Sequence, residues 1–278
     1  MKKKLIIAGS IVAGLLLAGV LYVWYQYSQF QKVEIIRVDP LLTVYKGGGN
    51  SIALTTKDGA TALIVDTKMG GAAEVQRNDI KADTITIVNT HDHSDHAGGN
   101  ALYPKATVIA GAYGKEQWDK DSSGAAYPAR TLQPGEEMVI PVGDETAVIR
   151  NMGRGHTQND TVVFLKKRGL LVTGDLVFLG QHPALIERSG TNIASWITHL
   201  DDLYARFDAK SLVPGHGPVS DRKAILDMKE YFTSIRDAVA SPEKLDALRE
   251  KYKNYRGMPI MMNFNATVSY IKKEMERK

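Results

Sequence analysis

The stretch His91-Asp92-His93-Ser94-Asp95-His96 places three imidazoles and two carboxylates in six consecutive residues. It follows the alternating apolar pattern of Thr84–Asn89, which predicts a strand, so the run begins in the loop after that strand. Imidazole and carboxylate are the ligands that zinc and similar divalent metals prefer. Such a dense cluster fits neither a hydrophobic core nor an ordinary surface, and it predicts half of a metal site.

Three more ligand-type residues occur in the same context, each beside a glycine and just past a predicted strand. They are His156 after Thr146–Asn151, Asp175 after Leu170–Thr173, and His216 after Ser211–Val213. Glycine lets the backbone pack closely around an ion, and loops at one edge of a sheet are where functional residues collect. The recurrence of one pattern predicts that these residues complete the site begun at His91.

The composition limits the classes of protein that remain. With 278 residues and 44% hydrophobic residues, the chain can form one large domain or two small ones. It contains no cysteine, so a zinc site must use histidine and carboxylate. The formal charge is +4, of which Lys2, Lys3 and Lys4 supply three, leaving about +1 for the rest. This nearly neutral remainder predicts no nucleic-acid partner.

Strand and helix patterns follow the same rough order twice along the chain, which favours an α+β fold with two β-sheets and helices outside each. The apolar spacing in Asn192–Phe207 predicts an amphipathic helix, and Gly70-Gly71 opens a shorter helix through Asn78. The segment Asp121–Pro128 is rich in serine, glycine and alanine, and predicts an exposed loop.

The N-terminus predicts export. Residues 5–25 form an uncharged apolar run after the three lysines, and as a helix this run is roughly 30 Å long, about one bilayer core. The positive-inside rule keeps the lysines in the cytoplasm. We therefore expect a membrane anchor in residues 1–30 and a domain in residues 31–278 on the outer side of a cell membrane, in the periplasm or the extracellular space. A cleaved signal peptide is the alternative, and the protein would then be secreted.

The ordered set His91-x-His93-x-Asp95-His96, His156, Asp175 and His216 resembles the metallo-β-lactamase superfamily of dinuclear zinc hydrolases, over roughly residues 33–220. The resemblance implies a four-layer αββα sandwich. It also implies that His91, His93 and His156 hold one zinc ion, that Asp95, His96 and His216 hold a second, and that Asp175 bridges both. Asp95 is then also the catalytic residue that orients the nucleophile or passes a proton. Iron or manganese would fit the same ligands.

Two residues indicate which branches of the superfamily this chain resembles most. Diiron oxygen reductases of this fold have glutamate where this chain has His93, and zinc β-lactamases typically lack the aspartate that Asp175 provides. Glyoxalase II and lactonases resemble this chain in having that aspartate, as does ribonuclease Z, which an export segment disfavours. The segment Gly155–Val163 is also similar to exported hydrolases linked to quinoprotein or sulfur oxidation systems.

We therefore expect an exported, membrane-anchored dinuclear zinc hydrolase that acts on an ester, thioester or lactone-type small molecule. A zinc β-lactamase and a non-catalytic metal-binding partner of a membrane complex are the alternatives. Several further roles stay open. Asp92 is either a partner of a ligand or a solvated residue, and Asp160 is either a partner of a ligating histidine or a carboxylate at a strand start. His182 lies in the pocket or in a surface loop, His199 is packed or solvated, and Met258–Met262 with Phe264 form a flap over the site or part of the core.

Overall fold

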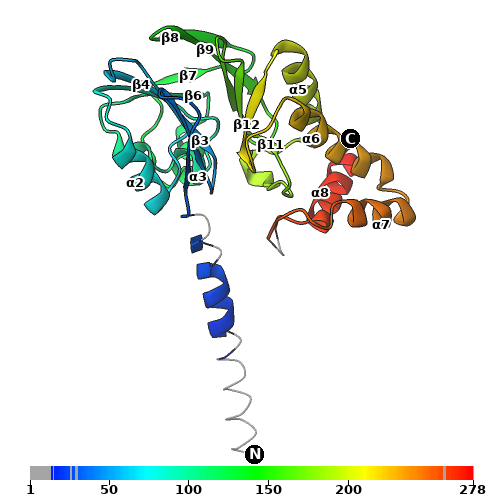
Figure 1. The fold of residues 1–278 in the computed structure, drawn as a ribbon. Helices are drawn as coiled ribbons and strands as arrows, with labels where there is room; N and C mark the ends of the chain where they lie inside the picture. Colours follow the sequence, from blue (N-terminus) through cyan, green and yellow to red (C-terminus); the bar gives the residue numbers. More distant parts are fainter. Residues whose placement is uncertain (1–13, 15, 26, 29–30, 259–260, 278) are drawn as a thin grey trace, which may run out of the picture.

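The computed structural model describes residues 14, 16–25, 27–28, 31–258 and 261–277. Two β-sheets lie face to face, with helices on the outer faces (Figure 1). The first sheet has seven strands in sequence order: β1 (Glu34–Arg37), β2 (Leu42–Lys46), β3 (Ser51–Thr55), β4 (Thr61–Val65), β5 (Thr84–Val88), β6 (Thr107–Gly111) and β7 (Arg130–Leu132). The second has five strands, in the order β12 (Ser211–His216), β11 (Leu170–Phe178), β10 (Asp160–Leu165), β9 (Glu145–Gly153) and β8 (Glu137–Val142).

The helices form the outer layers. They are α2 (Gly70–Asp79), α3 (Ser94–Ala97), α4 (Lys115–Asp121), α5 (Ile193–Arg206), α6 (Lys223–Ala238), α7 (Pro242–Lys251) and α8 (Phe264–Glu276), with the short 3₁₀ helices η1 (Asn100–Leu102) and η2 (Glu187–Ser189). Helices α5 and α6 cover the outer face of the second sheet, and α7 and α8 pack against α6 (Figure 1). The α+β prediction with two sheets and outer helices is confirmed.

The two-residue period of the strands explains the layering, because successive side chains point to opposite faces. In β3, Ile52 and Leu54 enter the core between the sheets, whereas Ala53 packs in the outer cluster that includes Ile80 at the end of α2. On the far side of the second sheet, the buried Trp196 of α5 packs edge-on against Phe232 of α6. The central strands of each sheet are thus buried on both faces, as a sandwich with outer helices requires, while the edge strands β1 and β8 are partly exposed.

The parallel strands bring the functional loops to one edge. Strands β4, β5 and β6 run parallel, as do β11 and β12, so their carboxyl ends lie at the same edge of each sheet. The predicted ends of the last two strands were wrong, since Asp175 lies within β11 and His216 is the final residue of β12. The pairing of β11 with β12 shifts register beside Gly174, whose φ of +52° needs glycine. This irregular step lets β11 continue past the shift while Asp175 still faces the site.

The prediction of an exposed loop over Asp121–Pro128 was wrong at its start. Asp121 ends α4 as a buried residue, and Ser122 and Ala125 are buried as well. The indole Nε1 of Trp118 donates to the carbonyl of Ala125 at 2.9 Å, which folds the segment back against α4. Small polar residues here build a tight turn rather than a solvated loop.

The predicted membrane helix over residues 5–25 falls partly outside the described residues, which omit 1–13 and 15. Residues 16–25 are helical, with exposed apolar side chains, and leave the domain on the side of α2 and α3 (Figure 1). Within the ranges that the structure describes, no helix is both long enough and apolar enough to cross a membrane.

Candidate metal centre

Four of the predicted ligands form a first buried group. His91, His93, His156 and Asp175 each direct one ligand atom to a common point, with all these atoms within 4.8 Å of one another. His156 Nε2 lies 3.1 Å from His93 Nδ1 and 3.3 Å from Asp175 Oδ2, and His91 Nε2 lies 3.8 Å from the same carboxylate oxygen. The segments that follow β5 and β9 place three imidazoles beside the carboxylate of Asp175, which lies within β11.

The other three predicted ligands form a second group around the opposite oxygen of Asp175. His96 Nε2 and His216 Nε2 lie 3.1 Å and 3.4 Å from Asp175 Oδ1. Asp95 Oδ2 lies 3.3 Å from His216 Nε2 and 3.5 Å from His96 Nε2. The two oxygens of Asp175 therefore face two different sets of donors, and all seven predicted ligands are together.

The donors fit two divalent ions. A tetrahedral zinc ion with bonds of about 2.0–2.1 Å has ligand atoms about 3.3–3.4 Å apart, close to the spacings in both groups. His91 Nε2, His96 Nε2 and Asp175 Oδ1 are buried and make no hydrogen bond, although they point into the cluster. Unsatisfied buried polar atoms are rare in proteins, and atoms that converge in this way fit a bound metal ion. The nitrogen and oxygen donors suit zinc, iron or manganese.

Electrostatics separates the two groups. Burial lowers the pKa of the His91 imidazole well below its usual range and that of His156 to about 3, so both are neutral, as a metal ligand must be. Burial also acts on His96 and His216, but the Asp175 and Asp95 carboxylates outweigh it. They raise the pKa of His96 well above normal and that of His216 to about 9. The second group is therefore where positive charge is most strongly stabilised.

Asp66 orients two of the histidines, and sequence reasoning missed it. Its Oδ2 lies 2.7 Å from His96 Nδ1 and accepts the Thr90 hydroxyl at 2.8 Å, while its Oδ1 accepts the Thr90 amide at 2.7 Å. The Thr90 oxygen also lies 3.0 Å from His91 Nδ1. A carboxylate that holds the far nitrogen fixes the tautomer and the ring direction of a ligating histidine. The sequence could have indicated Asp66, because this aspartate directly follows the apolar strand β4, just as the predicted ligands follow predicted strands.

A second relay, also missed, supports His93. Its Nε2 lies 3.1 Å from the Ser189 hydroxyl, which donates to Asp121 Oδ2 at 2.8 Å. Asp92 lies nearby, buried and outside both donor groups, and its pKa is raised to about 8 by burial and by the Asp121 charge. Asp92 is therefore a buried neighbour of the relay, and with His93 and Asp121 it forms a third group of donors that could hold a metal ion. No local sequence pattern links Ser189 or Asp121 to His93, because they come from segments far apart in the chain.

Replacing Ser189 by alanine is expected to free the His93 ring and to lower metal affinity or activity about 10- to 100-fold, the usual effect of losing such a partner. Competition with a chromogenic chelator measures the affinity. The half-buried Ser234, whose hydroxyl donates to the carbonyl of Tyr231 in its own helix, supplies the control Ser234→Ala. Unchanged affinity and activity in Ser189→Ala would show that the ring is held without this relay.

The remaining open residues have structural contacts. Asp160 accepts hydrogen bonds from the amide and the hydroxyl of Thr157, at 3.0 Å and 2.6 Å, so it holds the backbone next to His156. His182 does not line the pocket beside the site, since its Nδ1 lies 2.7 Å from the Tyr231 hydroxyl. His199 is half-buried on α5, with Nε2 3.1 Å from the carbonyl of Arg154.

A buried lysine stabilises the loop above His96. Lys68 Nζ donates to the carbonyls of Gly47 and Gly49 at 2.6 Å and 2.5 Å, and burial lowers its pKa to about 7. A Cβ on Gly49 would lie 2.6 Å from His96 Nε2, so only glycine allows this approach. Asn50 ties the loop to the backbone around His216 through the carbonyls of Pro214 and Gly217, both at 2.9 Å.

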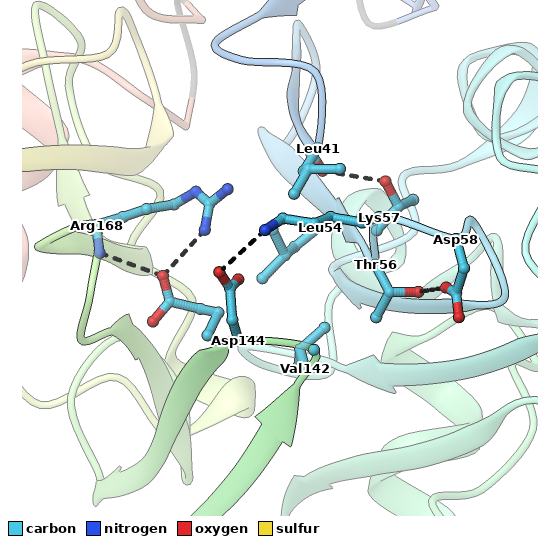
Figure 2. A pocket seen from close by; sticks show the side chains of 11 residues that line it. Leu41, Leu54, Thr56, Lys57, Asp58, Val142, Asp144 and Arg168 are labelled. Carbon is cyan, nitrogen blue, oxygen red and sulfur yellow. Dashed lines mark hydrogen bonds and ion pairs between the residues drawn. The ribbon is translucent and has the colours of Figure 1, made fainter.

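A second pocket, of about 280 Å³, lies at the opposite end of β4, between the hairpin turns. Figure 2 shows Lys57 reaching toward Asp144 across it, at 3.7 Å, with Arg168 on the facing side. Arg168 pairs with the buried Glu145 at 3.1 Å and also with Asp39. The pairs Lys57–Asp144 and Arg168–Asp39 connect the two sheets, and the predicted ligands lie elsewhere.

The fold is a sandwich of two β-sheets with outer helices, and two groups of donors at one edge could each hold a metal ion. The family model described as the metallo-beta-lactamase superfamily matches residues 44–216. The chain therefore belongs to the metallo-β-lactamase superfamily.

Curated relatives include hydrolases of two kinds. A hydroxyacylglutathione hydrolase of Synechococcus sp. (strain JA-3-3Ab) is 31% identical over 134 residues, covering 46% of this chain and 48% of the relative. A metallo-beta-lactamase type 2 of Bacillus cereus is 25% identical, covering 64% and 70%. This chain spans about half the length of the hydroxyacylglutathione hydrolases that it matches. The solved metallo-beta-lactamase from Pontibacter korlensis has a TM-score of 0.60 at 22% identity, covering 72% of this chain and 99% of that one, which supports the fold.

Proposed function

We propose that the protein is a dinuclear metal hydrolase of ester, thioester or lactone-type small molecules, with zinc as the expected metal. The observation that carries the proposal is the position of Asp175, whose two carboxylate oxygens each face a separate set of donors at 3.1–3.8 Å. In this assignment His91, His93 and His156 bind one ion, Asp95, His96 and His216 bind the other, and Asp175 bridges them. When bound, two such ions make a water acidic enough to supply hydroxide near neutral pH and polarise a substrate carbonyl.

Asp95 is the residue that we assign to proton transfer. It lines the pocket beside the donor groups, and its side chain is 19% exposed, whereas that of Asp175 is only 3% exposed. The imidazoles of His96 and His216 stabilise its charged form and hold the pKa of its carboxyl below the usual range, against the effect of burial. An ionised carboxylate at the pocket floor can orient a water molecule and then carry its proton toward a leaving group.

The choice among substrates rests on Asp175. The superfamily members that this chain resembles in having this aspartate are glyoxalase II and the lactonases, and curated relatives named hydroxyacylglutathione hydrolase are among the matches. Curated relatives named metallo-beta-lactamase also match, so β-lactam hydrolysis is the second candidate. Fold alone does not choose between them.

We also propose that residues 5–25 anchor the chain in a cell membrane, with Lys2, Lys3 and Lys4 in the cytoplasm and the hydrolase domain outside. Supporting this placement, the sequence from Leu5 to Gln31 contains no Asp, Glu, Lys or Arg. Protease digestion of intact spheroplasts tests it, because an external domain is degraded without lysis and an internal one survives.

Metal analysis of the purified full chain, followed by a substrate panel, tests the enzymatic proposal. We expect two zinc ions per chain and turnover of thioester, ester or lactone that is faster than turnover of a chromogenic cephalosporin. The reverse order would instead identify a β-lactamase. Two bound ions with no turnover of any member of the panel would favour a non-catalytic metal-binding protein.

A further inference from the structure

The pocket above the donor groups has an apolar wall. It encloses about 300 Å³ and has His93, Asp95, Asp175 and His216 among its lining residues. Much of the remaining lining is apolar: Tyr27, Met69, Phe178, Ala184, Ile186, Met258, Met261 and Met262. Methionine side chains are flexible and adapt to irregular apolar ligands. The pocket therefore fits a substrate whose reactive carbonyl adjoins a hydrophobic chain.

Three distant segments build this wall. Tyr27 comes from the N-terminal helix, Met69 precedes α2, and Met258, Met261 and Met262 precede α8. Met261 is 54% exposed at the pocket although it is fully apolar. Of the two roles that the sequence left open for the methionine cluster, the core role is confirmed for Met262, and the flap role stays a prediction.

The end of the N-terminal helix contacts the start of α2 beside the pocket, whereas residues 16–25 extend away from the domain (Figure 1). Gln31 Oε1 accepts the amide of Ala72 in the first turn of α2 at 3.3 Å, and the Tyr27 hydroxyl lies near Gly70 at the start of that helix. Immediately before Tyr27, the helical residues 16–25 expose Leu16, Leu17, Val20 and other apolar side chains. An exposed apolar surface of this size marks contact with a membrane or a partner.

Resting on the proposed hydrolysis and membrane anchorage, we propose that the pocket opens toward the bilayer that holds the helix. It takes an ester or thioester with a long acyl chain from that bilayer, and the chain lies along Tyr27 and Met261. In the reaction the acyl carbon loses its bond to the alcohol oxygen or thiol sulfur and gains the hydroxyl of water. The leaving group takes the remaining proton, so the products are a fatty acid and a free alcohol or thiol.

A chain-length series tests the pocket. With the full chain in phosphatidylcholine vesicles, kcat/KM referred to the thioester dissolved in water is expected to rise, from acetyl to dodecanoyl, about fourfold per methylene that leaves water for the pocket. The dodecanoyl-to-acetyl ratio should fall about tenfold in Met261→Ser and in Tyr27→Ser. It should stay at the wild-type value in Met275→Ser, because Met275 is similarly exposed but lies on α8 away from the pocket. If kcat/KM does not change with chain length while the acetyl thioester is still hydrolysed, the acyl-chain inference is wrong and the hydrolase proposal is unaffected.

Two further arms identify the source of the substrate. Dodecanoyl thioester in the same vesicles as the protein should be hydrolysed at least tenfold faster than the same ester in separate vesicles, and equal rates would overturn the membrane source. A diazirine-bearing dodecanoate should label peptides that contain Tyr27 or Met261, whether or not turnover occurs. Absence of turnover at every chain length, with an ester or lactone still hydrolysed, overturns the acyl-thioester inference and leaves the hydrolase proposal standing. Absence of this labelling overturns the acyl-chain site itself.

Discussion

Asp175→Asn is expected to reduce the bound metal from two ions per chain to at most one and to lower kcat/KM by about a thousandfold, because a metal that polarises a carbonyl contributes several kcal/mol and each 1.36 kcal/mol is tenfold. An asparagine keeps one oxygen, which can serve either the His156 side or the His96 side. Its amide nitrogen is a donor and cannot bind the second ion. Elemental analysis and steady-state kinetics on the same preparation measure both effects.

Two variants make this result specific. Asp144→Asn removes a carboxylate whose partners are the exposed Lys57 and Lys167, and it should leave metal content and rate unchanged. Asp95→Asn alters only the second group, so it should retain the first ion and lose most of the rate. Two tightly bound ions and a normal rate in Asp175→Asn would rule out the bridging role.

The layers and the ligand positions were accessible from the sequence because both depend on local patterns. Alternation in β3 and β4 assigns side chains to opposite faces, and the structure places Ile52 and Ala53 in different clusters accordingly. The run from His91 to His96 follows the parallel strand β5, and His156 follows β9, which pairs antiparallel with its neighbours, so both could be read from a strand end. The role of these residues as metal ligands stays a prediction until metal analysis is done.

The support around the ligands was not accessible in the same way. Ser189 and Asp121 reach His93 only after η2 and α4 pack together, and their separation along the chain carries no periodic signal. Asp121 looked like part of an exposed loop because its neighbours are small and polar, yet that segment folds back through the Trp118 indole. Tertiary contacts overrode local composition at this point.

Strand ends were misjudged for a related reason. Glycine at position 174 suggested that β11 stops at Thr173, whereas a left-handed glycine there shifts the register and β11 continues. A bulge of this kind re-aims a side chain next to a functional site. Asp175 gains its position between the two donor groups from that shift. The feature that obscured the strand end is thus the one that places the proposed bridging carboxylate.

Removal of the metals is expected to abolish hydrolysis and to lower the thermal midpoint of the full chain by about 10 °C. Ions present at a thousandfold over their dissociation constant stabilise the folded state by about 4 kcal/mol, and each kcal/mol shifts the midpoint of a domain of this size by about 2–4 °C. Without ions, His91 Nε2 remains buried with no hydrogen-bond partner, and the ion pairs of His96 and His216 with Asp175 replace only part of the lost bonds. Calorimetry with and without a chelator measures the shift.

Adding metal ions back to the metal-free protein distinguishes binding at a specific metal centre from general screening of charge. Zinc should restore both the midpoint and the activity, whereas magnesium should restore neither, because it prefers oxygen ligands and the two groups offer five imidazoles. In Asp175→Asn, where at most one ion binds, the chelator should produce about half of the wild-type shift. A midpoint that stays constant after metal analysis reads zero would mean that the buried histidines are stable alone. In that case the cluster would be a structural core feature, and the two-ion assignment would have to be abandoned.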